Sequence, residues 1–269
     1  MVRKRIQLAQ NFLKSSSLIW KLISKTSIDD QDIVYEIGAG SGIITSELIK
    51  KAGKVIVIEL DKNLIDKLID IFGQNSKVEI HQGNFLEYQL SSPKYKVFSN
   101  IPFNITSDIV RKLLYSSNTP EDAYLILQQE AAMKFSGNPT ETEFSILAKP
   151  WFTFESVWDF QRTDFFPVPS VNVSLLHIHK RETPLVSHEN ADLYRLFVKY
   201  GFGAWKKDLK TAYKDIFSYE QWKRLSKDNR FPIKAIPTQL TFEQWMKLFE
   251  FLLKSVPPNK RNNLNKLHK

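Results

Sequence analysis

Short apolar runs alternate with helical patterns along the first half of the chain. Five runs rich in Val, Ile and aromatic residues have the character of strands: 33–37, 54–59, 77–81, 95–99 and 123–128. Between them, Ile and Leu recur at helical spacing in residues 43–51, 63–72 and 107–115. This alternation predicts a mostly parallel α/β sheet flanked by helices, with right-handed crossovers that bring the carboxyl ends of the strands to one edge. Ligands are expected along that edge.

The pattern changes after Trp151. Two late strand-like runs, 151–154 and 171–176, flank a proline-rich turn and are expected to complete the sheet with an antiparallel edge. Beyond Pro184 the apolar spacing is helical in four segments: 193–202, 205–217, 219–225 and 241–253. Thr241 and Gln244 have the spacing of a capping box at the start of the last segment. We therefore predict one domain over residues 1–183 and a small all-helical domain over 184–269.

Composition narrows the class of protein. The chain has 269 residues, 42% of them apolar and 25% charged, which suits one large core and a smaller second one. No apolar run approaches the roughly 20 residues that cross a bilayer, and no apolar signal segment follows Met1, so we expect a cytoplasmic protein without membrane association. The absence of cysteine excludes disulfides and thiolate metal sites. His177 and His179 alternate in a strand-like run, where we expect a structural role and no catalytic metal.

The net charge of +9 lies entirely in residues 184–269, where 17 Lys and Arg accompany 8 Asp and Glu. A basic surface attracts phosphate backbones through counterion release, so RNA contacts are expected here; a solvated helical surface is the alternative. Arg111, Lys112 and Lys134 are further candidates for backbone contacts near the ligand-binding edge, with solvated charges again as the alternative.

The tetrapeptide Asn100-Ile101-Pro102-Phe103 follows the fourth strand-like run. The side-chain oxygen of Asn100 and the backbone carbonyl of Ile101 can accept both hydrogens of an exocyclic amine, and Phe103 offers a face to a flat heterocycle. This arrangement suits chemistry on the amino nitrogen of a base. An ordinary turn after a strand is the alternative.

A glycine loop, Glu36-Ile37-Gly38-Ala39-Gly40-Ser41-Gly42, follows the first strand-like run and leads into a helical segment. A dinucleotide-binding loop would need a third glycine where Ile43 stands. Glu59 ends the next strand-like run, where a carboxylate can bind both hydroxyls of an adenosine ribose. Asn84 follows the third run, and its side-chain carbonyl can accept a hydrogen bond from an adenine amine.

Four segments, in this order, carry a resemblance to a known family: 10–13, 36–42, 100–103 and 165–171. The chain resembles the rRNA adenine N6-dimethyltransferase superfamily, whose fold is a Rossmann-like class I S-adenosylmethionine-dependent methyltransferase sheet. Residues 197–207 and 239–245 resemble the Erm branch, which methylates one adenine of 23S rRNA and thereby prevents binding of macrolides, lincosamides and streptogramin B. The competing branch methylates adjacent adenines near the 3′ end of small-subunit rRNA.

The resemblance implies S-adenosyl-L-methionine as cofactor and assigns its contacts to eight residues: Gln10, Asn11, Leu13, Gly38, Gly40, Glu59, Asn84 and Asn100. Asn84 stands where the methyltransferase pattern usually has Asp. Catalysis falls on Asn100, Ile101 and Phe103. Phe103 and Phe165 would hold the target base, with core packing as the alternative for Phe165.

Gln10 and Asn11 could instead cap the helix expected from Leu18. The implied partner is 23S rRNA, and nothing in the sequence demands a second subunit, so we expect a monomer. Two other readings remain open at this point: a DNA adenine methyltransferase, and a non-catalytic RNA-binding factor built on the same fold.

Overall fold

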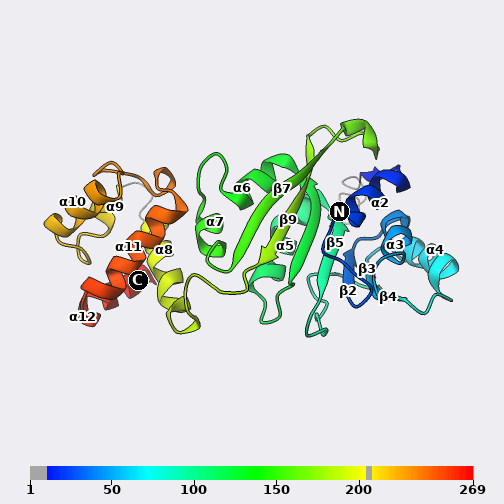
Figure 1. Ribbon diagram of the computed structural model, residues 1–269, viewed down its shortest axis with the longest axis horizontal. Helices are drawn as coiled ribbons and strands as arrows, with labels where there is room; N and C mark the ends of the chain where they lie inside the picture. Colours follow the sequence, from blue (N-terminus) through cyan, green and yellow to red (C-terminus); the bar gives the residue numbers. More distant parts are fainter. Residues whose placement is uncertain (1–10, 204–207, 269) are drawn as a thin grey trace. The chain divides into compact units, whose positions relative to one another are not determined.

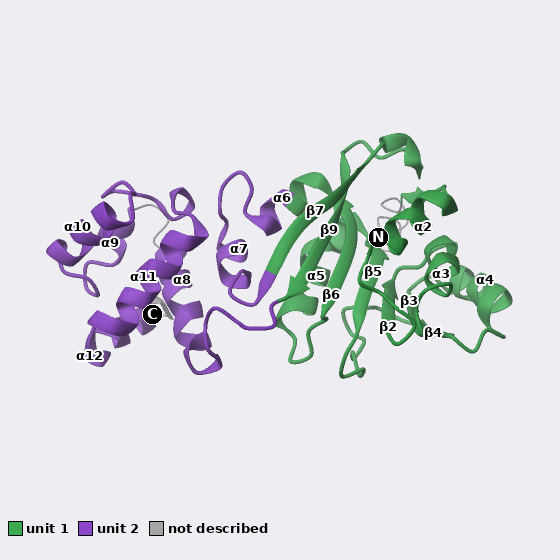
Figure 2. Ribbon diagram, viewed as in Figure 1, with its two compact units in different colours: residues 1–132, 153–180 green, residues 133–152, 181–269 purple. Residues whose placement is uncertain are grey.

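The computed structural model describes residues 11–203 and 208–268 (Figure 1). The chain divides into two compact units (Figure 2). The first comprises residues 1–132 and 153–180, and the second residues 133–152 and 181–269. The chain passes from the first unit to the second for the last time after residue 180, close to the boundary expected near residue 183. The segment 133–152 also belongs to the second unit, although the sequence predicts it in the first domain. No helix within the described ranges is long and apolar enough to cross a membrane.

The first unit contains a seven-stranded sheet in the order β4-β3-β2-β5-β6-β9-β7. Its strands are β2 (Ile33–Ile37), β3 (Lys54–Glu59), β4 (Val78–Gln82), β5 (Lys96–Asn100), β6 (Asp122–Gln128), β7 (Phe152–Phe160) and β9 (Val173–Lys180). The five strands from β2 to β6 pair in parallel, as the alternating pattern predicts. Their carboxyl ends therefore share one edge.

The late strands differ from the expected arrangement in one respect. The antiparallel strand β9 pairs with β6 and lies inside the sheet, and β7 takes the edge position. The burial of the two strands agrees with this order. Residues 173–176 of β9 are all buried, whereas most residues of β7 are exposed or half-buried. Strand β9, with a neighbouring strand on each side, is buried along most of its length, and the edge strand β7 is largely open.

Helices connect the strands of the first unit: α2 (Ser16–Ser24), α3 (Ile43–Leu48), α4 (Lys62–Phe72), α5 (Thr106–Tyr115) and the start of α6 (Gln129–Ser136). The hydroxyl of Ser15 accepts a hydrogen bond from the backbone N–H of Leu18 at 3.2 Å and caps α2. Asn11 is therefore not the cap of this helix, and Gln10 lies outside the described residues.

A separate two-stranded ribbon joins distant parts of the sequence. Strand β1 (Phe12–Leu13) pairs antiparallel with β8 (Phe165–Phe166), so that Phe12 lies opposite Phe166 and Leu13 opposite Phe165. Because this pairing has a period of two, Leu13 and Phe165 both face the core and are 3% and 0% exposed. The amino-terminal segment thus reaches the proline-rich turn.

The second unit is helical. It contains α7 (Glu143–Ala148), α8 (Ala191–Gly203), α9 (Leu209–Ala212), α10 (Tyr219–Asp228), α11 (Phe242–Ser255) and α12 (Pro258–Arg261). Its core contains many buried aromatic side chains, among them Tyr194, Phe197, Tyr213, Phe217, Trp222, Trp245 and Phe249. The capping box of Thr241 and Gln244 is present at the start of α11. Of the helix expected over 205–217, the described part contains only α9.

In the part of the chain that the structure describes, short 3-10 helices lie at five places: Phe103–Ile105, Arg162–Asp164, His188–Asn190, Pro237–Gln239 and Asn262–His268.

Candidate active site

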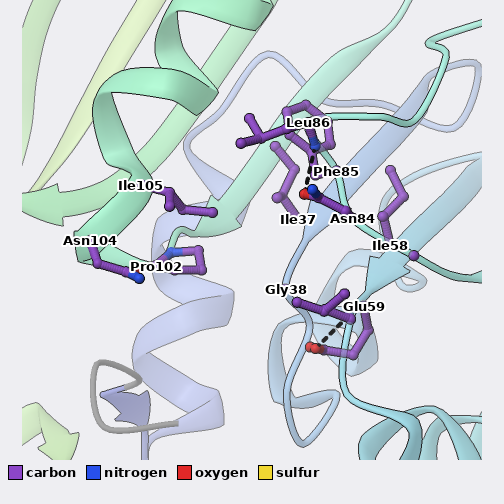
Figure 3. A pocket seen from close by; sticks show the side chains of 12 residues that line it. Ile37, Gly38, Ile58, Glu59, Asn84, Phe85, Leu86, Pro102, Asn104 and Ile105 are labelled. Atoms are coloured by element: carbon purple, nitrogen blue, oxygen red, sulfur yellow. Dashed lines mark hydrogen bonds between the residues drawn. The ribbon is translucent and has the colours of Figure 1, made fainter. Parts of the chain in front are cut away.

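A cavity lies at the shared carboxyl edge of the parallel strands (Figure 3). Residues that end or follow β2, β3 and β4 line one side, and the segment after β5 lines the other: Ile37, Gly38, Ile58, Glu59, Leu60, Gly83, Asn84, Phe85, Leu86, Pro102, Asn104 and Ile105. The walls are mostly apolar. Gly38 and Glu59 lie across from Pro102 and Asn104 in this view. The position is the one that the topology predicts for a ligand.

The glycine loop packs closely against the amino-terminal ribbon. Gly40 has a φ of +59°, and a Cβ there would lie 2.5 Å from the Cε1 of Phe12. A side chain at Gly40 would therefore strain the backbone and displace the Phe12 ring. The backbone N–H of Gly38 donates to the carbonyl of Ile58 at 2.8 Å, which joins the loop to the end of β3.

Glu59 is 2% exposed, and its carboxylate accepts three backbone N–H groups. Oε2 accepts from Gly40 at 3.0 Å, and Oε1 accepts from Leu60 at 2.8 Å and Asp61 at 3.0 Å. A carboxylate offers about four acceptor positions, so roughly one remains for a ligand. Glu59 therefore holds the glycine loop to β3 in addition to facing the cavity.

Glu36, the second carboxyl of this region, is 1% exposed in β2. Its Oε2 accepts a hydrogen bond from the hydroxyl of Thr45 at 2.6 Å, whereas Oε1 has no partner among the described residues. Burial, assisted by the negative charge of Glu59 and opposed by the Thr45 hydrogen bond, raises the pKa of Glu36 to about 8. The group is therefore mostly protonated at neutral pH.

The loop after β4 forms the cavity wall next to Asn84. The side-chain oxygen of Asn84 accepts from the backbone N–H of Leu86 at 3.0 Å, and its amide donates to Glu87 at 3.0 Å. This is the geometry of an Asx turn, which shapes the loop locally. One acceptor position of the Asn84 oxygen stays available to a ligand.

Lys112 in α5 supports the same loop. Its ammonium group donates to the carbonyls of Phe85, at 2.6 Å, and Tyr88, and it lies 4.9 Å from the centre of the Phe85 ring. Desolvation lowers the pKa of Lys112. The sequence makes Lys112 a candidate for contacts to an RNA backbone, with a solvated charge as the alternative. In the structure its ammonium group instead binds two carbonyl groups of the protein. The residue spacing in α5 gives no sign of this role, because the partner loop is 24 to 27 positions away.

The tetrapeptide after β5 lies beside a second, smaller cavity, lined by Asn11, Phe12, Gly38, Asn100, Ile101, Pro102 and Phe103. The side-chain amide of Asn100 donates to the backbone carbonyl of Asn11 at 2.7 Å. This hydrogen bond fixes the amide plane, and none of the described residues donates to the side-chain oxygen of Asn100, which can therefore accept from a ligand. The N–H of Ile101 donates to the carbonyl of Ile126 at 3.2 Å and anchors the turn to β6.

A third cavity adjoins Phe103 and reaches the proline-rich turn. Its lining residues come from four places in the sequence: Asn11, Phe103, Asn104, Gln128, Pro167, Val168, Pro169, Ser170 and Val171. Asn11 and Phe103 line both this cavity and the one beside Asn100. A flat ring placed here would meet the half-buried face of Phe103.

The structure places Phe165 apart from these cavities. Its ring is 0% exposed, lies in the core and contacts Phe160 edge-on at 5.4 Å between ring centres. This position corresponds to core packing, the alternative that the sequence left open. The neighbouring Phe166 is 69% exposed. Pairing of β8 with β1 decides which of the two rings faces the core.

The strand order, the glycine loop after the first sheet strand and the buried acid ending the next define a class I S-adenosylmethionine-dependent methyltransferase. The chain belongs to the ribosomal RNA adenine dimethylase family, whose sequence model matches residues 1–254. It is therefore an S-adenosylmethionine-dependent rRNA adenine N6-methyltransferase.

Individual relatives come from both branches of this family. An rRNA adenine N-6-methyltransferase of Bacillus licheniformis is 27% identical over 261 residues, covering 96% of this chain and 90% of the relative. A ribosomal RNA small subunit methyltransferase A of Nostoc sp. is 28% identical over 269 residues, covering 94% and 99%. The crystal structure of the 23S rRNA methyltransferase ErmE superposes with a TM-score of 0.84 at 24% identity, covering 91% of this chain and all (100%) of that one.

The residues around the first cavity fit S-adenosylmethionine. Apolar side chains such as Ile58 and Phe85 suit an adenine ring, and Asn84 adds an acceptor for its amine. The remaining acceptor position of Glu59 suits a ribose hydroxyl. The cavity therefore offers the chemistry that this cofactor needs, and the smaller cavity beside Asn100 shares Gly38 and Pro102 with it.

Proposed function

We propose that the protein methylates the N6 amino group of a specific adenine in 23S rRNA and thereby confers resistance to macrolides, lincosamides and streptogramin B. One observation carries the chemical part of this proposal. The amide of Asn100 is held by the Asn11 carbonyl at 2.7 Å, at a cavity that shares residues with both the cofactor cavity and the Phe103 cavity.

The adenine amine is a poor nucleophile because its lone pair is delocalised into the ring. In our proposal the side-chain oxygen of Asn100 and the carbonyl of Ile101 each accept one amine hydrogen, which localises the lone pair on nitrogen. The bound cofactor supplies an electrophilic methyl group on a sulfonium. Orientation and fixed dipoles are worth about 7–11 and 3–4 kcal/mol in favourable cases. The proton of the methylated amine leaves to water, so no histidine or cysteine base is required.

For the cofactor we propose contacts from Asn11, Leu13, Gly38, Gly40, Glu59, Asn84 and Asn100, and from Gln10 outside the described residues. The three amide hydrogen bonds to Glu59 limit it to roughly one further contact, so we assign it one ribose hydroxyl. Leu13 is buried in β1 and contributes through its backbone or by supporting Asn11.

For the target base we propose stacking on Phe103. A stacked adenine in RNA must leave its neighbours to reach the amine acceptors, at a cost of a few kcal/mol. One aromatic face offsets this by roughly 1–3 kcal/mol. Residues 167–171 line the same cavity as Phe103, and the buried Phe165 anchors the start of this segment in the core.

Support for the 23S branch comes from the helical unit as well as from the likeness to ErmE. The two segments that resemble Erm proteins meet directly. A Cβ on Gly201 would lie 2.6 Å from both the Trp245 ring and the Tyr213 hydroxyl. Gly201 and Trp245 thus form one close packing contact. We further propose that the basic surface of residues 184–269 contacts the RNA backbone, and that the enzyme acts as a monomer.

A small-subunit rRNA adenine dimethyltransferase is the second candidate, because the Nostoc relative bears that name and covers nearly the whole chain. Transfer of labelled methyl groups from S-adenosylmethionine to naked 23S rRNA and, separately, to 16S rRNA distinguishes the two. We expect N6-methylated adenosine in 23S rRNA alone. Labelling confined to 16S rRNA would overturn the proposed target.

Resistance is tested by expression in a susceptible bacterium. The protein should raise the inhibitory concentrations of erythromycin and lincomycin, and Asn100→Ala should not. If both proteins leave these concentrations unchanged although 23S rRNA is methylated in vitro, the resistance part of the proposal fails.

A further inference from the structure

Two imidazoles and one carboxylate gather in the first unit, at the opposite end of the sheet strands from the candidate active site. His177 and His179 project from the same face of β9 because they are two residues apart. The register places Asp122 of β6 opposite His179, and β5 places Asp122 beside Lys96. Since Asn100 ends β5 and Lys96 begins it, the cluster is separate from the methylation site.

The spacing within the cluster suits a metal ion. The Nε2 of His177 lies 2.7 Å from Oδ1 of Asp122, and the Nδ1 of His179 lies 2.9 Å from the same oxygen. The three atoms all lie within 4.8 Å of one another. Two ligands at a right angle, each about 2.1 Å from an ion, stand about 3 Å apart. Small rotations of the imidazoles would therefore bring all three atoms into one coordination sphere.

We propose that Asp122, His177 and His179 bind one divalent transition-metal ion, with water in the remaining positions. Imidazole nitrogen with carboxylate oxygen favours Zn²⁺, Co²⁺ or Ni²⁺ over Mg²⁺ or Ca²⁺. The His179 side chain is 45% exposed, which opens the cluster to solvent. The ion would connect β6 to β9 and serve as a structural clip.

A second layer of contacts orients the ligands. The hydroxyl of Ser27 donates to Oδ2 of Asp122 at 2.7 Å, which turns Oδ1 toward the imidazoles. The Tyr124 ring stacks on His177 with centres 4.3 Å apart and planes 8° apart, and its hydroxyl donates to Ser27 at 3.2 Å. Partners of this kind hold metal ligands in position before the ion binds.

Charge also favours a cation. The neighbouring ammonium of Lys96 is paired with Asp32 at 2.8 Å and donates to the Ser27 carbonyl at 2.7 Å. Its charge is thus offset locally, and the carboxylate of Asp122 remains to attract the ion.

The test uses the full-length, untagged, metal-free protein. Titration with Co²⁺, followed by visible absorption, and with Zn²⁺, followed by calorimetry, should each show one equivalent bound, and Zn²⁺ should raise the melting temperature. His179→Asn keeps a polar group near the Nδ1 position but removes the imidazole. It should weaken binding by more than about tenfold, and Ser27→Ala by about tenfold, because outer contacts typically contribute about 10–100-fold.

His188→Asn is the matched control, since His188 is exposed in the second unit and lies outside the cluster. Circular dichroism first establishes that each variant folds. Loss of the one-equivalent binding in His179→Asn, with retention in His188→Asn, supports the proposal. Failure of the native protein to bind Co²⁺ or Zn²⁺, or equal binding by His179→Asn, overturns it and leaves a purely hydrogen-bonded cluster.

Discussion

Replacing Glu36 with Gln should change how the stability of the protein depends on pH. Burial raises the pKa of this carboxyl from 4.5 to about 8, against the opposing hydrogen bond from Thr45. The folded state therefore holds this proton more tightly than the unfolded chain does. In that case the free energy of unfolding falls as the pH rises between the two pKa values. The stability linked to protonated Glu36 is complete below about pH 4.5 and is lost by about pH 8.

The size of the effect follows from the two pKa values. One pKa unit corresponds to about 1.4 kcal/mol, so a change from 4.5 to about 8 amounts to roughly 5 kcal/mol. About 4 kcal/mol of this falls between pH 5 and pH 9. Gln cannot ionise and can still accept from Thr45. The free energy of unfolding of Glu36→Gln, relative to the native protein, should therefore rise by about 4 kcal/mol over that range.

Denaturant unfolding of the cofactor-free protein measures this difference. Circular dichroism at constant ionic strength gives the free energy at each pH for the native protein and for Glu36→Gln. Glu155→Gln is the control. Glu155 is exposed in β7, so this substitution makes the same chemical change at the surface. A difference between Glu36→Gln and the native protein that stays flat from pH 5 to pH 9 would refute a protonated Glu36.

Four further predictions concern catalysis and the cofactor. Asn100→Ala should lower the rate of methyl transfer by about 100- to 1,000-fold, as loss of a preorganised polar contact does elsewhere, in single-turnover assays with labelled cofactor. Phe103→Leu should weaken RNA methylation by roughly 1–3 kcal/mol and cofactor binding far less; equal losses would count against stacking. Asn84→Ala should weaken cofactor binding in calorimetry by about 1 kcal/mol, and Asn84→Asp should not; native affinity in Asn84→Ala would contradict the assignment. Lys112→Met should raise KM for the cofactor with little change in kcat, and Lys112→Arg should partly restore it; unchanged KM would exclude the supporting role.

The sequence predicts the sheet well because buried parallel strands leave a strong local pattern. The expected runs match β2 to β6 to within one residue at each end. It also predicts that the glycine loop, Glu59 and Asn100 meet, since all three follow carboxyl ends of neighbouring parallel strands. These relations need only that the strands run parallel, because parallel strands bring their carboxyl ends to one edge of the sheet.

Contacts between distant segments could not be predicted in this way. Phe165 and Phe166 are alike in sequence, and only the register with Leu13 and Phe12 decides which ring is buried. The contact of Lys112 with the loop after β4 likewise depends on how α5 packs against the sheet. The alternation of His177 and His179 predicts that both lie on one face of a strand. It does not identify their partner Asp122, which is 55 and 57 positions away.

The amino-terminal segment belongs to the candidate active site, because three consecutive residues contact three different parts of it. The carbonyl of Asn11 holds the Asn100 amide at 2.7 Å, Phe12 lies against Gly40, and Leu13 pairs with Phe165 beside the proline-rich turn. A displacement of Phe12 would move the two flanking residues, since Phe12 and Leu13 pair with β8 and Asn11 directly precedes them. One short segment thus positions the glycine loop, Asn100 and the start of the proline-rich turn together.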